Sequence, residues 1–380
     1  MKRILVLATN ASDAKSVVLW GLREAGHQCL VMGNLSKNTE LPHSPLCRKF
    51  YAIPEEYSFE KKSPEIVPLI RRVLEQNDID VICPSGFESV KFLSLFLDQL
   101  TQMKFCVPVP ALETIKELSD KYVFASLCRN YGIPHPQTYL LENMNAVEEN
   151  RLLVKFPLLT KPLRMSASKG IYTFQGRDEL LQYLKTKKED GSNALPLLLQ
   201  EYIPGFDIDF NGFGYQGRLS AWTIQKFIEI PRDKKQPLRW LQFLRNDEIL
   251  RIGKTIVEKT GYSGPIHVDL RVEEHSGRVY AIEVNPRFWA STFASMSDGV
   301  NFADVAIQCA INPHYQKAPR YACRIWGSPH HLPYLLLRHP NREMWQLACQ
   351  HTLFQVRHVL FNQLLFGQIA RKGVLIREGT

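Results

Sequence analysis

Two carboxylates and an amide lie close together in the stretch Gly264–Ser291, which reads as two strands joined by a tight polar turn. With the turn centred near Ser276, Asp269 and Glu283 fall almost opposite each other, and Asn285 lies one step further along the same face. Oxygen atoms this close repel each other unless a cation lies between them. Hard oxygen ligands, few in number, suit Mg²⁺ that also holds substrate phosphates, so the sequence predicts a metal site here.

The motif Glu-Val-Asn-Pro-Arg completes this stretch, and Arg287 at its end can reach an anion beside the metal. A solvated strand edge with scattered charges is the alternative, and the motif favours the metal site. Alternation predicts that the second strand has two different faces. One face is Tyr280, Ile282 and Val284, and the other is Ala281, Glu283 and Asn285.

Two earlier segments have residues suited to phosphate. Phe156–Pro162 reads as an apolar strand that carries Lys161, and a buried lysine is costly unless it faces an anion. The loop Arg164–Gly170 follows it. Its hydroxyls, cations and glycine are typical of a loop that covers phosphates, and the residues concerned are Ser166, Ser168, Lys169 and Gly170. An ordinary surface loop is the alternative.

The segment Leu197–Asp207 is an apolar strand that runs into a Pro-Gly turn. Such a segment can offer backbone groups to the edge of an adenine, and Asp207 can accept hydrogen bonds from ribose hydroxyls. The alternative is an edge strand followed by a turn, without a ligand.

The first third of the chain must support these segments, and it alternates strands with helices. The pattern predicts strands at Arg3–Thr9, Gln28–Met32, Asp80–Cys83 and Phe105–Val107, and helices at Asp13–Ala25, Pro64–Gln76 and Phe87–Leu97. This is a doubly wound α/β unit. Its first turn, Ala8–Ser12, lacks the glycines of a dinucleotide site. The G-x-G-x-x-G at Gly212, Gly214 and Gly217 lies between two strand-like segments and opens no helix, so we interpret it as a hairpin turn.

The order of the motifs resembles that of the ATP-grasp superfamily. Asp120-Lys121 with a following G-I-P-x-P, then F-P-x-x-x-K-P, the Ser/Gly loop, Q-E-Y-I-P-G-x-D and finally V-D-L with I-E-V-N-P-R stand in this order. The resemblance covers roughly residues 1–310 and is greatest to the branch of carbamoyl-phosphate synthase, biotin carboxylase and carboxylate–amine ligases. It implies an α/β fold in which a Rossmann-like domain (1–111) precedes an ATP-grasp domain (112–312), with a lid at about 120–200 and a larger part at about 201–312. A basic, mainly helical extension (313–380) would follow.

The resemblance also implies roles for single residues. Lys121 and Lys161 would hold ATP phosphates; Glu201, Tyr202 and Ile203 would line the adenine hinge; Asp207 would bind the ribose. The metal ligands would be Asp269, Glu283 and Asn285, and the catalytic residues Arg287 and Lys226. The chain departs from many members in having one glycine in the loop, and from carboxylase-type members in having Asp269 where they have Glu.

The implied reaction activates a carboxylate as an acyl phosphate, which an amine then attacks, with release of ADP and phosphate. Its cofactors would be ATP and two Mg²⁺ ions, with Mn²⁺ as the alternative metal. Two other functions stay open: a carboxylase-type enzyme that uses bicarbonate, and a regulatory protein that binds ATP without turnover.

Composition places the chain among ordinary globular proteins, with 45% hydrophobic and 22% charged residues. None of the eight cysteines forms a C-x-x-C pair, which favours buried thiols in a reducing compartment, and we expect a cytoplasmic protein. The apolar run at the N-terminus is too short for a signal peptide and reads as a first strand. No stretch is long and apolar enough to span a bilayer.

The net charge of +9 belongs mainly to the C-terminal end, where His314–Thr380 holds nine Lys and Arg against two acids. Apolar positions in Glu343–Ile369 predict helices that pack on the body or on a partner. The basic surface could also contact an anionic membrane or an acidic carrier protein. We expect small-molecule substrates, no nucleic acid, and a homodimer as in many relatives.

Overall fold

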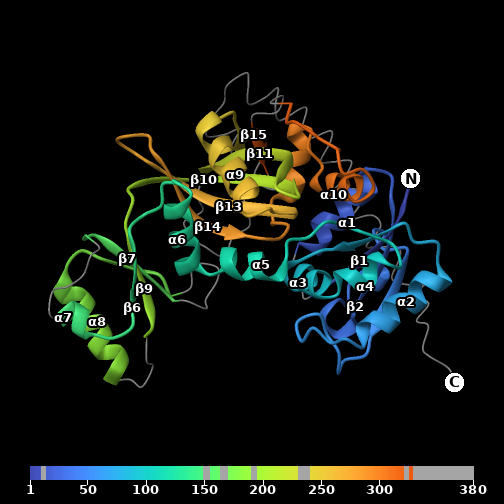
Figure 1. Ribbon diagram of the computed structural model, residues 1–380, viewed down its shortest axis with the longest axis horizontal. Coiled ribbons are helices and arrows are strands. Elements are labelled where there is room, and N and C mark those ends of the chain that lie inside the picture. Colours follow the sequence, from blue (N-terminus) through green and yellow to red (C-terminus); the bar gives the residue numbers. More distant parts are fainter. Residues whose placement is uncertain are drawn as a thin grey trace, which may run out of the picture.

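The computed structural model describes residues 1–9, 14–148, 155–162, 170–189, 195–229, 240–320 and 325–327. Three β-sheets organise this part of the chain, and each has its own helices (Figure 1). The parallel sheet lies at one end of the molecule, the large antiparallel sheet in the middle and the small antiparallel sheet at the other end. The predicted C-terminal helices in Glu343–Ile369 lie outside the described residues.

The N-terminal sheet is parallel, with strand order β3-β2-β1-β4-β5. Its strands are β1 (Arg3–Leu7), β2 (Gln28–Asn34), β3 (Lys49–Ile53), β4 (Val81–Pro84) and β5 (Phe105–Cys106). Four of the five strands were predicted. The alternation in Lys49–Ile53 was overlooked because most of this edge strand is only half buried and lacks a continuous apolar run.

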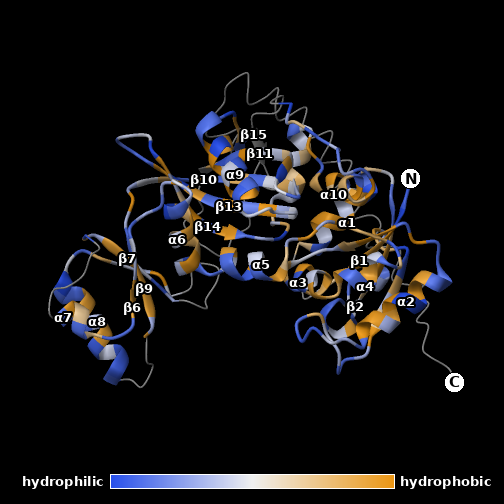
Figure 2. Ribbon diagram, viewed as in Figure 1, coloured by the Kyte–Doolittle hydropathy of each residue, from blue (hydrophilic) through white to orange (hydrophobic). Residues whose placement is uncertain are grey.

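Helices cover both faces of this sheet, as expected for a doubly wound unit. They are α1 (Lys15–Glu24), α2 (Ile66–Gln76), α3 (Phe87–Leu95) and α4 (Leu97–Thr101). One apolar cluster joins the sheet to α2 and α3, and another joins it to α1 and to α10 (Phe302–Ile311). Figure 2 shows the apolar strands at the centre of this unit. Because α10 comes late in the chain, the second cluster fastens the N-terminal unit to the middle one.

The large sheet is antiparallel, with strand order β14-β13-β10-β11-β12-β15. Its strands are β10 (Gly205–Tyr215), β11 (Arg218–Glu229), β12 (Trp240–Phe243), β13 (Gly264–Glu273), β14 (Val279–Asn285) and β15 (Ile325–Gly327). Helix α9 (Asp247–Lys259) packs its apolar side on one face of this sheet. The turn between β10 and β11 lies at Gln216 and Gly217, so the glycine-rich motif is a hairpin turn, as predicted.

One local prediction in this sheet is wrong. The register pairs Asp269 with Glu283 but Leu270 with Ala281, so Ile282 is an extra residue in β14. Because of this β-bulge, Ala281 is fully buried in the core beside Leu270, while Ile282 is only half buried. The bulge also brings Glu283 opposite Asp269, where the register nearer the turn would have placed Ile282. The predicted pairing of Asp269 with Glu283 is confirmed.

The small sheet is antiparallel, with strand order β6-β9-β7-β8. Its strands are β6 (Thr138–Leu141), β7 (Leu158–Pro162), β8 (Tyr172–Phe174) and β9 (Leu197–Glu201). Helices α7 (Asn145–Glu148) and α8 (Arg177–Glu189) pack on one face through an apolar cluster that includes Leu158 and Leu199. Lys161 is three residues after Leu158 on β7, so its side chain lies on the other face of the small sheet.

Helices α5 (Leu112–Ser119) and α6 (Lys121–Asn130) connect the three units (Figure 1). The Asp120 carboxylate accepts hydrogen bonds from the backbone N–H groups of Tyr122 and Val123, at 2.9 and 3.0 Å, and so caps α6. The cap begins the helix at Lys121 and places that side chain in the first turn of α6.

His135, between α6 and β6, makes stability depend on pH. Its Nδ1 donates to the Pro136 carbonyl oxygen at 2.7 Å, and its ring meets Phe124 edge to face. Burial, with repulsion from Lys161 and Arg129, lowers its pKa from 6.5 to about 4. The unfolded chain therefore binds more protons between these pH values. We expect the free energy of unfolding to fall by up to about 3 kcal/mol as the pH drops from about 6.5 to about 4.

Urea unfolding at pH 7 and pH 4.5 tests this prediction. His135→Phe keeps the aromatic contact, and its stability should decline less on acidification than that of the wild type. His275→Gln, in the exposed turn between β13 and β14, is the matched control and should keep the wild-type decline. An identical decline in His135→Phe and wild type would contradict the prediction.

Candidate active site

One face of the large sheet is polar at its centre. Neighbouring strands place their side chains there in two rows, because residues opposite each other in register share a face. The first row is Gln225, Asp209, Asp269 and Glu283. The second row is Thr223, Asn211, His267 and Asn285. Three carboxylates thus stand side by side on β10, β13 and β14, two of which the sequence predicted.

Asp269 lies at the centre of these contacts. Its Oδ2 accepts a hydrogen bond from Asn285 Nδ2 at 2.9 Å, and its Oδ1 lies 3.1 Å from His267 Nε2. Burial alone would raise the pKa of Asp269, but attraction and hydrogen bonding to His267, with smaller effects of Glu283 and Arg287, lower it. Asp269 is therefore a carboxylate at neutral pH and can bind a cation.

Arg287 lies beside the predicted metal ligands. Its guanidinium donates to Asn285 Oδ1 at 3.1 Å and to the Phe288 carbonyl oxygen at 3.0 Å. Burial lowers its pKa, while attraction to Asp269 and Glu283 opposes that change. The structure thus brings together Asn285 and Arg287, which the sequence predicted as metal ligand and anion contact.

Two lysines from other elements face the same carboxylates. Lys121 Nζ, at the start of α6, lies 3.5 Å from Glu283 Oε2. Lys161, on the inner face of the small sheet, is only 6% exposed. Burial lowers its pKa and repulsion from Lys121 adds to this, whereas attraction to Glu283, Asp269 and Asp207 opposes it. Lys121 thus contacts Glu283, and Lys161, from the small sheet, lies near enough to the same carboxylates for their charges to affect its pKa.

The predicted hinge connects β9 to β10, and Arg271 holds it in place. Its guanidinium donates to the carbonyl oxygens of Ile203 and Gly205 and to Asp207 Oδ1, at 2.5, 2.9 and 2.5 Å. It also lies 5.7 Å from the centre of the Tyr202 ring. Gly205 has φ of +145°, and a Cβ there would lie 1.9 Å from the Val272 carbonyl oxygen, so only glycine fits this turn.

Glu201, the last residue of β9, is bound to the segment that precedes β6. Its Oε2 accepts a hydrogen bond from the Gln137 backbone N–H at 3.1 Å, and its own N–H donates to the Gln137 carbonyl oxygen at 2.8 Å. These contacts fix the orientation of the hinge. The roles of Glu201, Tyr202, Ile203 and Asp207 in binding ATP stay predictions.

The remaining predicted residues lie elsewhere. Lys226 is opposite Ile208 in register, on the other face of β11 from Gln225, and its Nζ lies 3.6 Å from the centre of the Phe206 ring. The structure therefore does not place Lys226 in the polar rows. Gly170 is described and has φ of +71°. The loop residues Ser166, Ser168 and Lys169 lie outside the described residues.

The donor set fits Mg²⁺. Asp269 and Glu283 are directly opposite each other, and each side chain is 35% exposed, so both carboxylates can be reached from outside. Asn285 adds an amide oxygen, and cationic groups of Lys121, Lys161 and Arg287 surround the carboxylates. Hard oxygen donors of this type are the ligands that Mg²⁺ takes together with substrate phosphates.

Sequence reasoning missed Asp209, Asn211, Gln225, His267 and Arg271 as parts of this site. His267 and Arg271 alternate with Asp269 along β13, so period 2 already placed all three on one face. Asp209 likewise alternates with Asp207 along β10. The signal that was overlooked is a polar residue at every second position of strands that pack a core on their other face.

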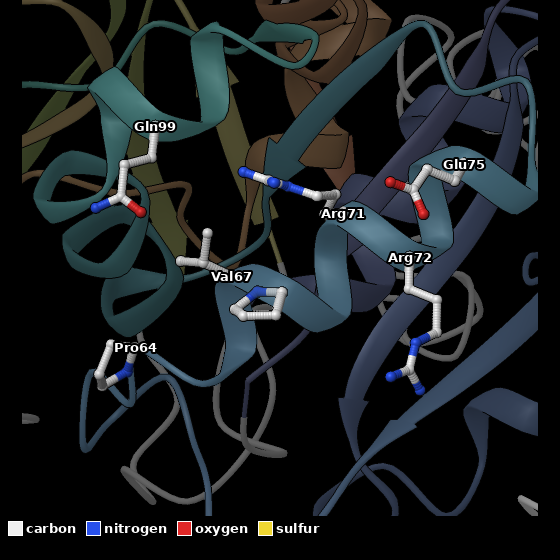
Figure 3. Close-up of a pocket in the computed structure, with 7 residues that line it drawn as sticks. Pro64, Val67, Arg71, Arg72, Glu75 and Gln99 are labelled. Carbon is white, nitrogen blue, oxygen red and sulfur yellow. The ribbon is translucent and has the colours of Figure 1, made fainter.

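A surface hollow of about 420 Å³ lies far from these residues, beside α2 (Figure 3). It is lined by Pro64, Val67, Pro68, Arg71, Arg72, Glu75 and Gln99. Figure 3 shows the Arg71 and Arg72 side chains pointing apart, so they do not converge on one ligand. The hollow therefore adds nothing to the site on the large sheet.

In the described part of the chain, no helix has the length and apolar character needed to cross a bilayer. The cysteines of that part are free, and Cys29, Cys83, Cys106, Cys128 and Cys309 are buried, as expected. Burial raises the pKa of the Cys106 and Cys128 thiols to about 12, which makes them unreactive.

Comparisons with known proteins agree with this geometry. The chain is 21% identical to D-aspartate ligase of Enterococcus faecium over 277 residues, which are 64% of this chain and 62% of that protein. It is 20% identical to the carbamoyl phosphate synthase large chain of Thermoanaerobacter pseudethanolicus over 337 residues, 87% of this chain but 30% of that one. The chain thus spans less than two thirds of both relatives. No protein-family model matches it.

Solved structures show the same fold. The biotin carboxylase domain of Hydrogenobacter thermophilus 2-oxoglutarate carboxylase superimposes with a TM-score of 0.66 at 18% identity, over 85% of this chain and 73% of that one. An L-amino acid ligase of Bacillus licheniformis gives 0.59 at 16% identity, over 82% and 74% of the two chains. In sequence the chain is thus similar to carbamoyl phosphate synthase and D-aspartate ligase, and in fold to a biotin carboxylase domain and an amino acid ligase, which confirms the resemblance to ATP-grasp ligases.

Proposed function

We propose that this protein is an ATP-dependent ligase that activates a carboxylate as an acyl phosphate and joins it to an amine, with release of ADP and phosphate. The observation that carries the proposal is the convergence of Lys121 and Lys161 on the paired carboxylates Asp269 and Glu283. Nucleotide binding alone does not need two carboxylates and an amide arranged as metal ligands. Phosphoryl transfer does need them, because negative charge must be neutralised where the phosphoryl group moves.

The nucleotide would lie between the small and large sheets. Lys161, whose ammonium is largely withdrawn from water, would bind a phosphate oxygen through a charge-assisted hydrogen bond. Lys121 would exchange its contact with Glu283 for a second phosphate contact. Mg²⁺ held by Asp269, Glu283 and Asn285 would neutralise charge on the phosphates. Because the lysines already face this position, little reorganisation would be needed when ATP binds.

The reaction would take place in two steps. First, a carboxylate oxygen of the substrate attacks the γ-phosphorus of ATP, the bond to the β-phosphate oxygen breaks, and ADP leaves. Next, the nitrogen of the amine attacks the acyl carbon, the acyl–phosphate bond breaks, and the amine loses a proton. Arg287, fixed by Asn285 and the Phe288 carbonyl, would orient the substrate carboxylate and stabilise the acyl phosphate.

We also propose the domain division that the resemblance implies. A Rossmann-like domain (1–111) precedes an ATP-grasp domain (112–312), and a C-terminal extension (313–380) follows. The three sheets support the first two of these domains, since β1–β5 form one sheet and β6–β14 lie in the two others. The large sheet also takes in β15, which belongs to the extension and pairs with β12. The small sheet would act as the lid, because Lys161 lies on its inner face and the hinge at Gly205 connects it to β10.

An assay of ADP release over a panel of carboxylates tests the function. Each carboxylate is measured with Mg²⁺-ATP alone, with a panel of amines, and with bicarbonate. We expect ADP release that requires both a carboxylate and an amine, with a product that contains a new C–N bond. Release that requires bicarbonate without an amine would indicate the carboxylase-type reaction. Binding of ATP with no release under any combination would contradict the ligase.

A further inference from the structure

The polar rows contain a second group of metal-ligating side chains, on the other side of Asp269 from Glu283. One ligand atom each of Asp209, His267 and Asp269 lies within 4.8 Å of the other two. We propose that these residues form a separate site for a divalent first-row transition-metal ion, which stays bound when no nucleotide is present. The inference deepens the proposed function, and rests on it, because it adds a resident metal to the same active site.

The histidine is oriented as a metal ligand. Its Nδ1 lies 2.7 Å from Asn211 Oδ1, which can only accept, so Nδ1 carries the hydrogen. In the neutral ring this leaves the lone pair on Nε2, the atom that faces Asp269. The ring also stacks on Trp289, with centroids 5.7 Å apart and an interplanar angle of 14°. A metal-bound histidine characteristically donates its other N–H in this way, which fixes both tautomer and ring orientation.

The buried residues around Asp209 also favour a bound metal ion. Asp209 is only 4% exposed and lies directly opposite Asp269, so a buried carboxylate meets a half-buried one. Asn211 and Gln225 are fully buried beside them, and neither Asn211 Nδ2 nor Gln225 Oε1 makes a hydrogen bond within the described structure. Buried polar atoms rarely stay unpaired. A metal ion would offset the repulsion, and a water molecule bound to it could donate to Gln225 Oε1.

The two oxygens of Asp269 separate this site from the Mg²⁺ site. Oδ1 faces His267, and Oδ2 faces Asn285. Asp269 could therefore bridge a resident ion on one side and the ion that arrives with the nucleotide on the other. Two carboxylates with one imidazole favour Mn²⁺, Fe²⁺, Co²⁺ or Zn²⁺, whereas Mg²⁺ prefers oxygen ligands alone. The other interpretation is an ion pair between protonated His267 and Asp269, with no metal.

Cobalt titration of the full-length protein, cleared of metal with a chelator and free of nucleotide, distinguishes the two. We expect one equivalent of Co²⁺ to bind, with visible absorption bands, and millimolar Mg²⁺ to displace it poorly. His267→Asn and Asp209→Asn should weaken binding by more than the about 10–100-fold that loss of an outer-shell partner causes. Asn211→Leu, which removes only the partner of Nδ1, should fall within that range.

Two matched variants control for charge. Asp207→Asn removes a carboxylate two residues from Asp209 on the same face, where Asp207 accepts a hydrogen bond from Arg271. This variant should keep tight Co²⁺ binding. Glu283→Gln should also keep it, because Glu283 belongs to the nucleotide side. No stoichiometric Co²⁺ binding without nucleotide, or binding that survives His267→Asn, would overturn the proposal.

Pulsed electron paramagnetic resonance on wild-type protein with Mn²⁺ keeps the test independent of how the variants fold. Modulation from an imidazole nitrogen is expected, and its absence would overturn the proposal. Neither measurement requires turnover. A protein that binds Co²⁺ without any ligase activity would contradict the proposed function alone, and an active ligase that binds no Co²⁺ would contradict this inference alone.

Discussion

Glu283→Gln is expected to fold normally and to lose ATP turnover by about 10²–10³-fold. Glu283 lies opposite Asp269 in register, and its carboxylate is the one that Lys121 approaches. Glutamine keeps the volume and the strand pattern but removes the charge and one good metal ligand. Without ligand, the melting temperature should change little, because lost repulsion with Asp269 and the lost contact with Lys121 offset each other.

Two measurements check this prediction: steady-state ADP release with the best substrate pair, and thermal unfolding with and without Mg²⁺-ATP. The wild type should gain stability from Mg²⁺-ATP by ligand linkage, and the variant much less. Glu274→Gln, in the exposed turn after β13, is the matched control and should behave as wild type in both. If Glu283→Gln keeps substantial substrate-dependent ADP release, this strand pair is not the catalytic metal site.

Lys161→Met is expected to lower kcat/KM for ATP by about 10²–10³-fold while making the ligand-free protein more stable. The stability gain follows from burial: the Lys161 residue is 6% exposed and burial lowers its pKa, so the free protein holds a poorly solvated cation. Methionine fills a similar volume without a charge. The activity loss follows because the same ammonium faces the position proposed for the phosphates.

Lys155→Met, at an exposed position shortly before β7, is the control and should change neither property. Thermal unfolding without nucleotide and kinetics at varied ATP concentration give the two readouts. Opposite changes in stability and activity are the signature of a binding residue, since a structural residue would lose both together. A destabilised Lys161→Met with unchanged kcat/KM for ATP would show that Lys161 serves packing alone.

Much of the metal site could be predicted because it is local in sequence. Asp269 and Glu283 belong to one hairpin, and in a hairpin the turn sets the register while period 2 sets the face. Counting outward from Ser276 paired these two residues, and the structure confirms the pairing, although the bulge at Ile282 contributes to it. The start of α6 is also set locally, since the Asp120 side chain caps the helix that begins at Lys121.

The sequence analysis assigned Ala281 to the wrong face of its strand. A bulge adds one residue to a strand without any mark in the alternation, and everything before it changes face. The extra residue, Ile282, lies between the turn and Glu283, and it shifts the register so that Asp269 meets Glu283 rather than Ile282. Ala281 faces the core because it packs beside Leu270 there, and such packing is a property of the tertiary structure.

The larger share of the site depends on contacts between distant segments. Asp209 is far from His267 in the chain, and only the strand order, with β13 between β10 and β14, makes them neighbours. Lys161 comes from another sheet, and its lowered pKa reflects burial that no pattern in β7 specifies. Sequence alone thus determined which residue types stand on each strand face, because alternation is a property of the extended backbone. Tertiary structure decided which faces meet, because sheet order and burial depend on the packing of the whole chain.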